Sequence, residues 1–73
     1  MNIDDYRSAK KNGLEERYRD DEISHRITSE VSLSEQIAIL ADRDTKPEKF
    51  KRYQELRAQK IQEVDAEIAE FKI

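Results

Sequence analysis

Two helix-start signals lie thirteen residues apart and constrain the fold more than any other feature of this chain. The stretches from Ser32 to Glu35 and from Thr45 to Glu48 both match the capping box, in which a Ser or Thr hydroxyl accepts from a backbone amide three residues on. Pro47 fits a first helical turn, where its missing N–H is not needed. Two helices joined by such a short link run antiparallel. The pattern predicts a helical hairpin with its corner near residues 43–47, and the predicted caps are Ser32, Glu35, Thr45 and Glu48.

The helix expected over residues 33–43 carries apolar side chains at steps of four and three, which is the spacing of one helical face. Aromatic residues follow early in the next helix, three positions apart. We expect these two faces to meet across the hairpin. The predicted hairpin core is Leu33, Ile37, Leu40, Phe50 and Tyr53.

The last helix is expected to run from residue 47 to about 72, a length of roughly 39 Å at 1.5 Å per residue. Its second half has apolar residues at steps of three, four and three, a short heptad seam. The residues of this predicted interaction seam are Ile61, Val64, Ile68 and Phe71.

The helix over 33–43 is too short to cover that seam. One alternative is a helix near residues 14–30, whose Ile23 and Ile27 would face it within the chain, followed by Val31. The other is a second copy of the chain. Gly13 is expected to separate this helix from a short, loosely attached helix that frays within residues 1–13, because glycine costs about 1 kcal/mol relative to alanine inside a helix.

The charge along the last helix favours the second copy. Residues 46–60 hold six basic and two acidic side chains, whereas residues 61–73 hold four acidic and one basic. This order opposes the helix dipole. An antiparallel pair of these helices would set each basic half against an acidic half. We therefore expect an all-α helical hairpin or small three-helix bundle that self-associates.

Composition limits what else the chain can be. Its 73 residues predict one domain, 42% of them are charged, and no cysteine is present to form a disulfide or a thiolate metal site. The N-terminal stretch lacks the apolar region of a signal peptide. The longest apolar run covers residues 37–41, far short of the roughly twenty residues that span a bilayer. We expect a protein with no membrane contact.

Chemistry-bearing motifs are scarce. Glu22 and His25 form a single E-x-x-H, whereas di-iron bundles need two such motifs and two further glutamates. The only glycine, Gly13, cannot make a phosphate-binding loop. Ser32 and Ser34 are interpreted as capping residues. We expect no catalytic residue, cofactor, metal or small-molecule substrate, and hence no enzyme.

Two charged regions leave other functions open. Asp20, Asp21 and Glu22 suggest an acidic inhibitor of a host enzyme or defence system. The basic stretch from Lys46 to Lys60, with Phe50 and Tyr53 between its cations, suggests a nucleic-acid-associated helper. A net charge of −3 disfavours the second function.

Residues 31–68 resemble small uncharacterised proteins encoded by bacteriophages and prophages of Gram-positive bacteria. The shared pattern is a capped helix, a short link with Pro-Glu and a following F-x-x-Y. The matching positions are Ser32, Leu33, Glu35, Ala38, Ile39, Leu40, Pro47, Glu48, Phe50 and Tyr53. Val31 departs from the pattern, which has an aromatic residue there. The resemblance implies a phage accessory or structural protein, and the expected function is a non-enzymatic protein–protein interaction module.

Overall fold

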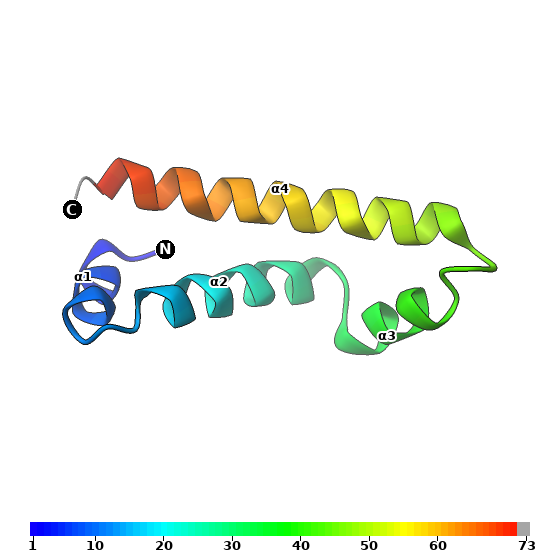
Figure 1. Cartoon of the computed structure of the whole chain (residues 1–73), viewed down its shortest axis with the longest axis horizontal. Coiled ribbons are helices and arrows are strands. Elements are labelled where there is room, and N and C mark those ends of the chain that lie inside the picture. The colour runs from blue at the N-terminus through cyan, green and yellow to red at the C-terminus, as the bar shows by residue number, and fades with distance from the viewer. Residues whose placement is uncertain (72–73) are drawn as a thin grey trace.

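The computed structural model describes residues 1–71, and they form four α-helices (Figure 1). The helices are α1 (Ile3–Lys11), α2 (Glu15–Glu30), α3 (Leu33–Ala41) and α4 (Pro47–Phe71). α2 runs antiparallel to α4, and α1, α2 and α3 follow one another along the same side of α4. The result is a rod of 45 × 19 × 17 Å. The predicted all-α fold with a long C-terminal helix is confirmed. Within residues 1–71, no helix is both long and apolar enough to cross a membrane.

The core lies between α2 and α4. Ile23 and Ile27 of α2 pack with Tyr53 and Val64 of α4, and the Val64 side chain is fully buried. The partly buried residues Ile61 and Ile68 border this cluster. The C-terminal seam is therefore covered within the chain by α2, the first of the two alternatives drawn from the sequence. The expectation that a second copy covers it is wrong, because α2 is long enough to do so.

Aromatic side chains join α1 to the first part of α2 and to the C-terminal end of α4. The Tyr6 ring lies 6.2 Å from the Tyr18 ring and 5.7 Å from the Phe71 ring, measured between centroids. Tyr6 is buried, and the Asn2 side chain caps α1 by accepting from two backbone amides. The short helix expected before Gly13 is thus present as α1, and the Tyr6 ring joins it to the rest of the fold. Gly13, at φ +70°, makes the turn into α2.

Of the two predicted capping boxes, the first forms its N-cap hydrogen bond and the second does not. The Ser32 hydroxyl accepts from the Glu35 amide at 3.2 Å, as expected. The Thr45 hydroxyl instead donates to the Asp42 carbonyl at 3.1 Å. Pro47 is the first residue of α4, so the N-cap position is held by Lys46 and not by Thr45 as predicted. The side chains of Glu35 and Glu48 are exposed.

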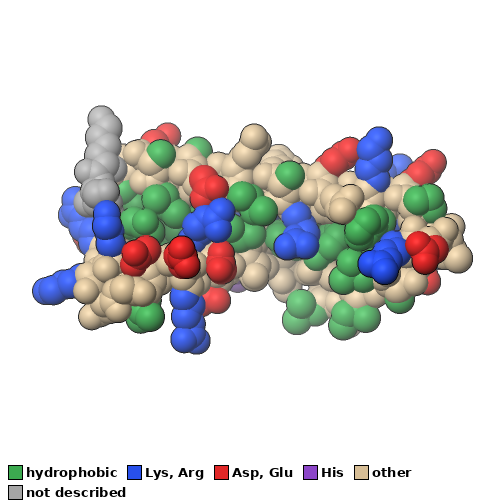
Figure 2. Space-filling model, viewed as in Figure 1, with side chains coloured by type: hydrophobic (Ala, Val, Ile, Leu, Met, Phe, Trp, Pro, Cys, Tyr) green, Lys and Arg blue, Asp and Glu red, His purple; other side chains and the backbone are tan. Residues whose placement is uncertain are grey.

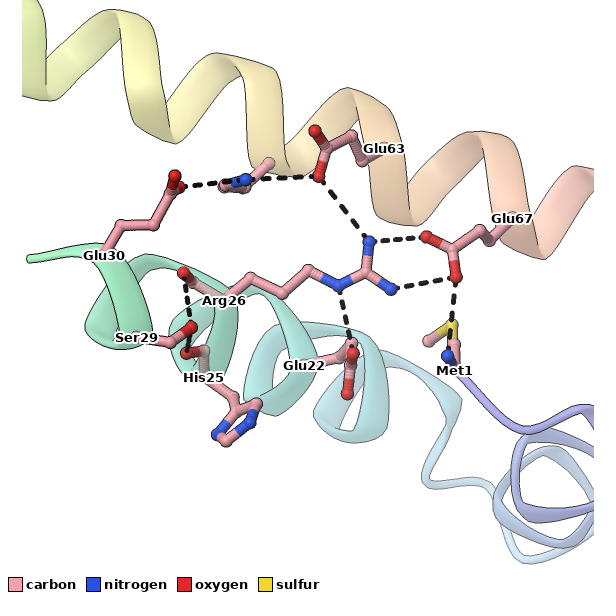
Figure 3. A network of polar contacts seen from close by, with 9 residues as sticks. Met1, Glu22, His25, Arg26, Ser29, Glu30, Glu63 and Glu67 are labelled. Carbon is pink, nitrogen blue, oxygen red and sulfur yellow. Dashed lines mark hydrogen bonds and ion pairs between the residues drawn. The ribbon is translucent and has the colours of Figure 1, made fainter.

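Ion pairs close one side of the contact between α2 and α4 (Figure 3). The Arg26 guanidinium donates two parallel hydrogen bonds to Glu67, and Nη2 lies 2.9 Å from Oε1. Its Nε also donates to Glu22 at 3.0 Å. The hydrogen bond from Arg26 holds the pKa of Glu67 below its ordinary value. The Met1 ammonium lies 3.5 Å from the same carboxylate.

Two further pairs extend this contact in both directions. The Arg19 guanidinium donates to both carboxylate oxygens of Asp65, at 2.6 and 3.1 Å. These hydrogen bonds lower the pKa of Asp65 and raise that of Arg19. Lys60 Nζ lies 2.9 Å from Glu30, whose contact raises the pKa of Lys60. In the C-terminal half of α4, Asp65 and Glu67 are thus paired with arginines of α2 in the same chain.

Candidate interaction face

The apolar stripe of α3 lies largely in solvent. The exposed fractions are 64% for Leu33, 68% for Ile37 and 45% for Leu40, and α3 has no buried residue. Figure 2 shows hydrophobic side chains at the surface of this end of the rod. The prediction that these three residues belong to the hairpin core is wrong. We call Leu33, Ile37 and Leu40 the α3 stripe.

A polar contact and one aliphatic side chain hold α3 in this orientation. The Tyr53 hydroxyl donates to Gln36 Oε1 at 2.7 Å, and Gln36 Nε2 donates to the Val31 carbonyl at 2.8 Å. Ile39 packs against the core from the same face of α3. Residues 36 and 39 are one turn apart and therefore share a face. That face meets α4 and leaves the α3 stripe in solvent.

The two aromatic residues predicted for the hairpin core lie at the contact with α4. Tyr53 is buried, and Phe50 is half-buried. The Arg57 guanidinium lies 5.9 Å from the centroid of the Tyr53 ring. The cations Lys46, Lys49, Lys51 and Arg52 are exposed. Because Tyr53 is inside the fold, this stretch does not offer its ring as a stacking surface for bases.

An open groove lies between α3 and α4, on the opposite flank of α3 from the stripe. It has a volume of about 230 Å³ and an apolar floor. Lys49 and Arg52 are the charged residues along it. A second hollow of about 250 Å³ shares Ile39 and Lys49 with it, and its other charged lining residues are Glu35, Asp42 and Lys46. The residues around the first groove are Val31, Ile39, Lys49, Arg52, Tyr53 and Leu56.

The acidic cluster of α2 is partly paired. Glu22 accepts from Arg26, and Asp20 lies 3.2 Å from Arg19 Nη1. Asp21 and His25 are exposed, and Glu22 is turned toward Arg26 rather than toward His25. Residues 1–71 contain no group of three or more His, Asp or Glu side chains arranged for a metal ion.

Comparisons with protein-family models, with curated proteins and with solved structures found no match. The exposed side chains of the chain itself therefore indicate which surface could bind a partner. The α3 stripe is the largest departure from an ordinary soluble surface, since single exposed apolar residues are normal but neighbouring ones mark interaction sites.

The spacing of Leu33, Ile37 and Leu40 marks the stripe in the sequence but does not show which way it faces. Gln36 and Ile39, which position the helix, were not predicted to do so. Their spacing is visible in the sequence, because Gln36 and Ile39 are one turn apart and share a face of the helix. A face with one glutamine and one isoleucine suits contact with a tyrosine, which has a hydroxyl and an apolar ring.

Proposed function

We propose that this chain is a non-enzymatic protein–protein interaction module, an accessory or structural protein of phage or prophage type, and that the α3 stripe is its docking face. The observation that carries this proposal is an apolar helix with no buried residue. A short helix that served only the stability of its own chain would turn Leu33, Ile37 and Leu40 inward. The proposed setting is the bacterial host cytoplasm or the virion.

The energetics support a partner that contacts more than the stripe. Removing three half- to two-thirds-exposed Leu and Ile side chains from water gains about 1–2 kcal/mol each. Association itself costs about 4–15 kcal/mol in lost motion. The α3 stripe alone barely offsets that cost. The docking face must therefore continue onto neighbouring surface, and the stripe would be its apolar centre.

The test compares the wild-type chain with a variant carrying Leu33→Gln, Ile37→Gln and Leu40→Gln. Each chain is immobilised and exposed to lysate of a Gram-positive bacterium that carries a related prophage, and its solution mass is measured by light scattering. The proposal expects the wild type to self-associate or to capture a defined protein, and the variant to do neither. Circular dichroism checks that both chains are helical, as expected because all three side chains are already exposed.

A triple variant that keeps the same mass and the same bound proteins as the wild type would contradict the proposal. Ala58→Gln is the matched control. Ala58 is exposed on α4, and its position, five residues after the buried Tyr53, directs it away from α2 and α3. It should leave both readouts unchanged.

A further inference from the structure

The large exposed hydrophobic residues lie at opposite ends of the rod. The α3 stripe occupies the end where α3 meets the start of α4. Leu14, which is 50% exposed, directly precedes α2. The turn between α1 and α2 lies at the other end of the rod (Figure 1). Along α2 between these ends, Asp21, Ser24 and His25 are exposed polar side chains. The α1–α2 turn, α2 and α3 all lie across from α4 (Figure 1), so the surface formed by these segments carries large exposed apolar side chains at its two ends and exposed polar ones between them.

The charge of the side chains is also divided between the two ends. Residues 32–60 carry seven Lys or Arg and five Asp or Glu, a net of +2. Residues 1–31 together with 61–71 carry six Lys or Arg and twelve Asp or Glu, a net of −6. The end that bears the α3 stripe is thus positive, and the end that bears Leu14 is negative. Complementary ends attract each other in an antiparallel arrangement.

We propose that two copies of this chain pair antiparallel through their α2–α3 sides, so that Leu14 of each copy lies against the α3 stripe of the other. The inference rests on the proposed function, in which the α3 stripe is a docking face. In a two-fold pair each contact occurs twice, so the large exposed hydrophobic residues within residues 1–71 of both copies are covered. One long side of the rod measures 45 × 17 Å. Its area is close to the ~800 Å² that each partner buries in a stable interface.

The same observations disfavour the simpler pair in which two α3 stripes face each other. That pair would bring two positive ends together and would leave both copies of Leu14 in water. Its contact would be limited to the nine residues of α3 in each copy, well below the area of a stable interface.

Engineered cysteines test the orientation directly, because the chain has none of its own. The Leu14→Cys and Ile37→Cys variants are oxidised separately and as an equal mixture, and the products are separated without reductant and weighed by mass spectrometry. Both positions are at least half exposed, so both variants should fold. The antiparallel pair predicts that covalent dimers form mainly in the mixture and join one variant to the other.

Two results would overturn the proposal. Covalent dimers formed efficiently by the Ile37→Cys variant alone would show that α3 stripes face each other. No covalent dimer in any sample, together with a monomeric wild-type mass at millimolar concentration, would exclude self-pairing. In the second case the proposed function would still stand if the wild type captures another protein and the triple Gln variant does not, so the two failures are distinguishable.

The strength of pairing gives an independent readout by analytical ultracentrifugation. We expect Ile37→Gln and Leu14→Gln each to raise the dimer Kd by about tenfold or more, since each side chain is removed from both contacts of the pair. Ala58→Gln is the control and should leave Kd unchanged. High salt should weaken pairing severalfold, because 1 M salt shortens the screening length to about 3 Å. A dimer Kd that stays unchanged in both Leu14→Gln and Ile37→Gln would contradict the proposed contact.

Discussion

The hydroxyl of Tyr53 donates to Gln36 Oε1 at 2.7 Å and so links the middle of α4 to the inner face of α3. Tyr53 is buried, and Gln36 is bonded in turn to the Val31 carbonyl. A buried tyrosine hydroxyl needs a hydrogen-bond partner, and Gln36 supplies it. Because of this contact, Gln36 faces α4 and the α3 stripe remains in solvent.

Tyr53→Phe should therefore destabilise the fold by about 1 kcal/mol, because Gln36 loses a buried partner while the ring stays in place. Urea unfolding followed by circular dichroism measures the change. A cycle with Gln36→Met and the double variant isolates the pair, and the double variant should lose less than the sum of the single losses. Strictly additive losses would mean that the two side chains do not interact.

Val64→Ala should cost about 2 kcal/mol of unfolding free energy, because it removes methyl groups from a fully buried position and leaves a cavity. Ile37→Ala, a comparable truncation at a position 68% exposed, should change the unfolding free energy by less than about 0.5 kcal/mol at concentrations where the chain is monomeric. Equal losses at the two positions would show that α3 packs by its stripe after all. Urea unfolding of both variants in parallel is the measurement.

Stability should fall in acid because Glu67 and Asp65 have lowered pKa values in the fold, each held by a hydrogen bond from an arginine. As the pH drops, the unfolded chain takes up protons at ordinary carboxyl pKa values while the folded chain still resists them. The contribution of these pairs is present above about pH 4.5 and is lost progressively below it, as the pH approaches the lowered values.

Thermal unfolding between neutral pH and pH 3 checks this acid dependence. Glu67→Gln should be less stable than the wild type at neutral pH and should lose less stability in acid, because one of the titrating groups is gone. Glu70→Gln is the control: Glu70 is an exposed acid on the same helix, and its loss should leave the wild-type pH profile in place. An identical pH profile for Glu67→Gln and the wild type would show that the pair with Arg26 contributes nothing to acid sensitivity.

Ser32→Ala should destabilise α3 by about 1 kcal/mol, because the Glu35 amide loses its capping acceptor. Amide hydrogen exchange across residues 33–41 reports this locally. Thr45→Ala is the matched control. Its hydroxyl donates to an exposed turn carbonyl instead of capping α4, so the expected cost is below about 0.5 kcal/mol. A larger effect at Thr45 than at Ser32 would contradict the observed caps.

Several features of the fold were predictable because they depend on neighbours in sequence. Ser32, Gly13 and Pro47 mark helix boundaries through their own backbone chemistry, and the structure places a boundary at each. The heptad spacing of Ile61, Val64 and Ile68 likewise marked the buried side of α4. Thr45 was mispredicted because two possible starts for α4 lie one residue apart, and proline at the first helical position decided between them.

The interaction face was harder to predict, because it depends on the rotation of α3 about its own axis. Both faces of α3 hold apolar residues, with Ile39 on one and Ile37 on the other, so periodicity alone favoured the longer stripe. In the same way, the acidic half of α4 suggested a second copy until Arg19 and Arg26 were seen to pair with it. Contacts between distant residues settled both questions.

The sequence by itself determined that this chain is helical, that breaks near Gly13, Ser32 and Pro47 separate the helices, and which side of the C-terminal half of α4 is buried. These follow from capping, backbone conformation and side-chain spacing within one helical turn. Only the tertiary structure decided that α2 covers the C-terminal seam and that Leu33, Ile37 and Leu40 remain in solvent. The physical reason is that a short helix is oriented by the sum of its contacts with its neighbour. On α3 the hydrogen bond from buried Tyr53 to Gln36, together with the packing of Ile39, outweighed the burial of the α3 stripe.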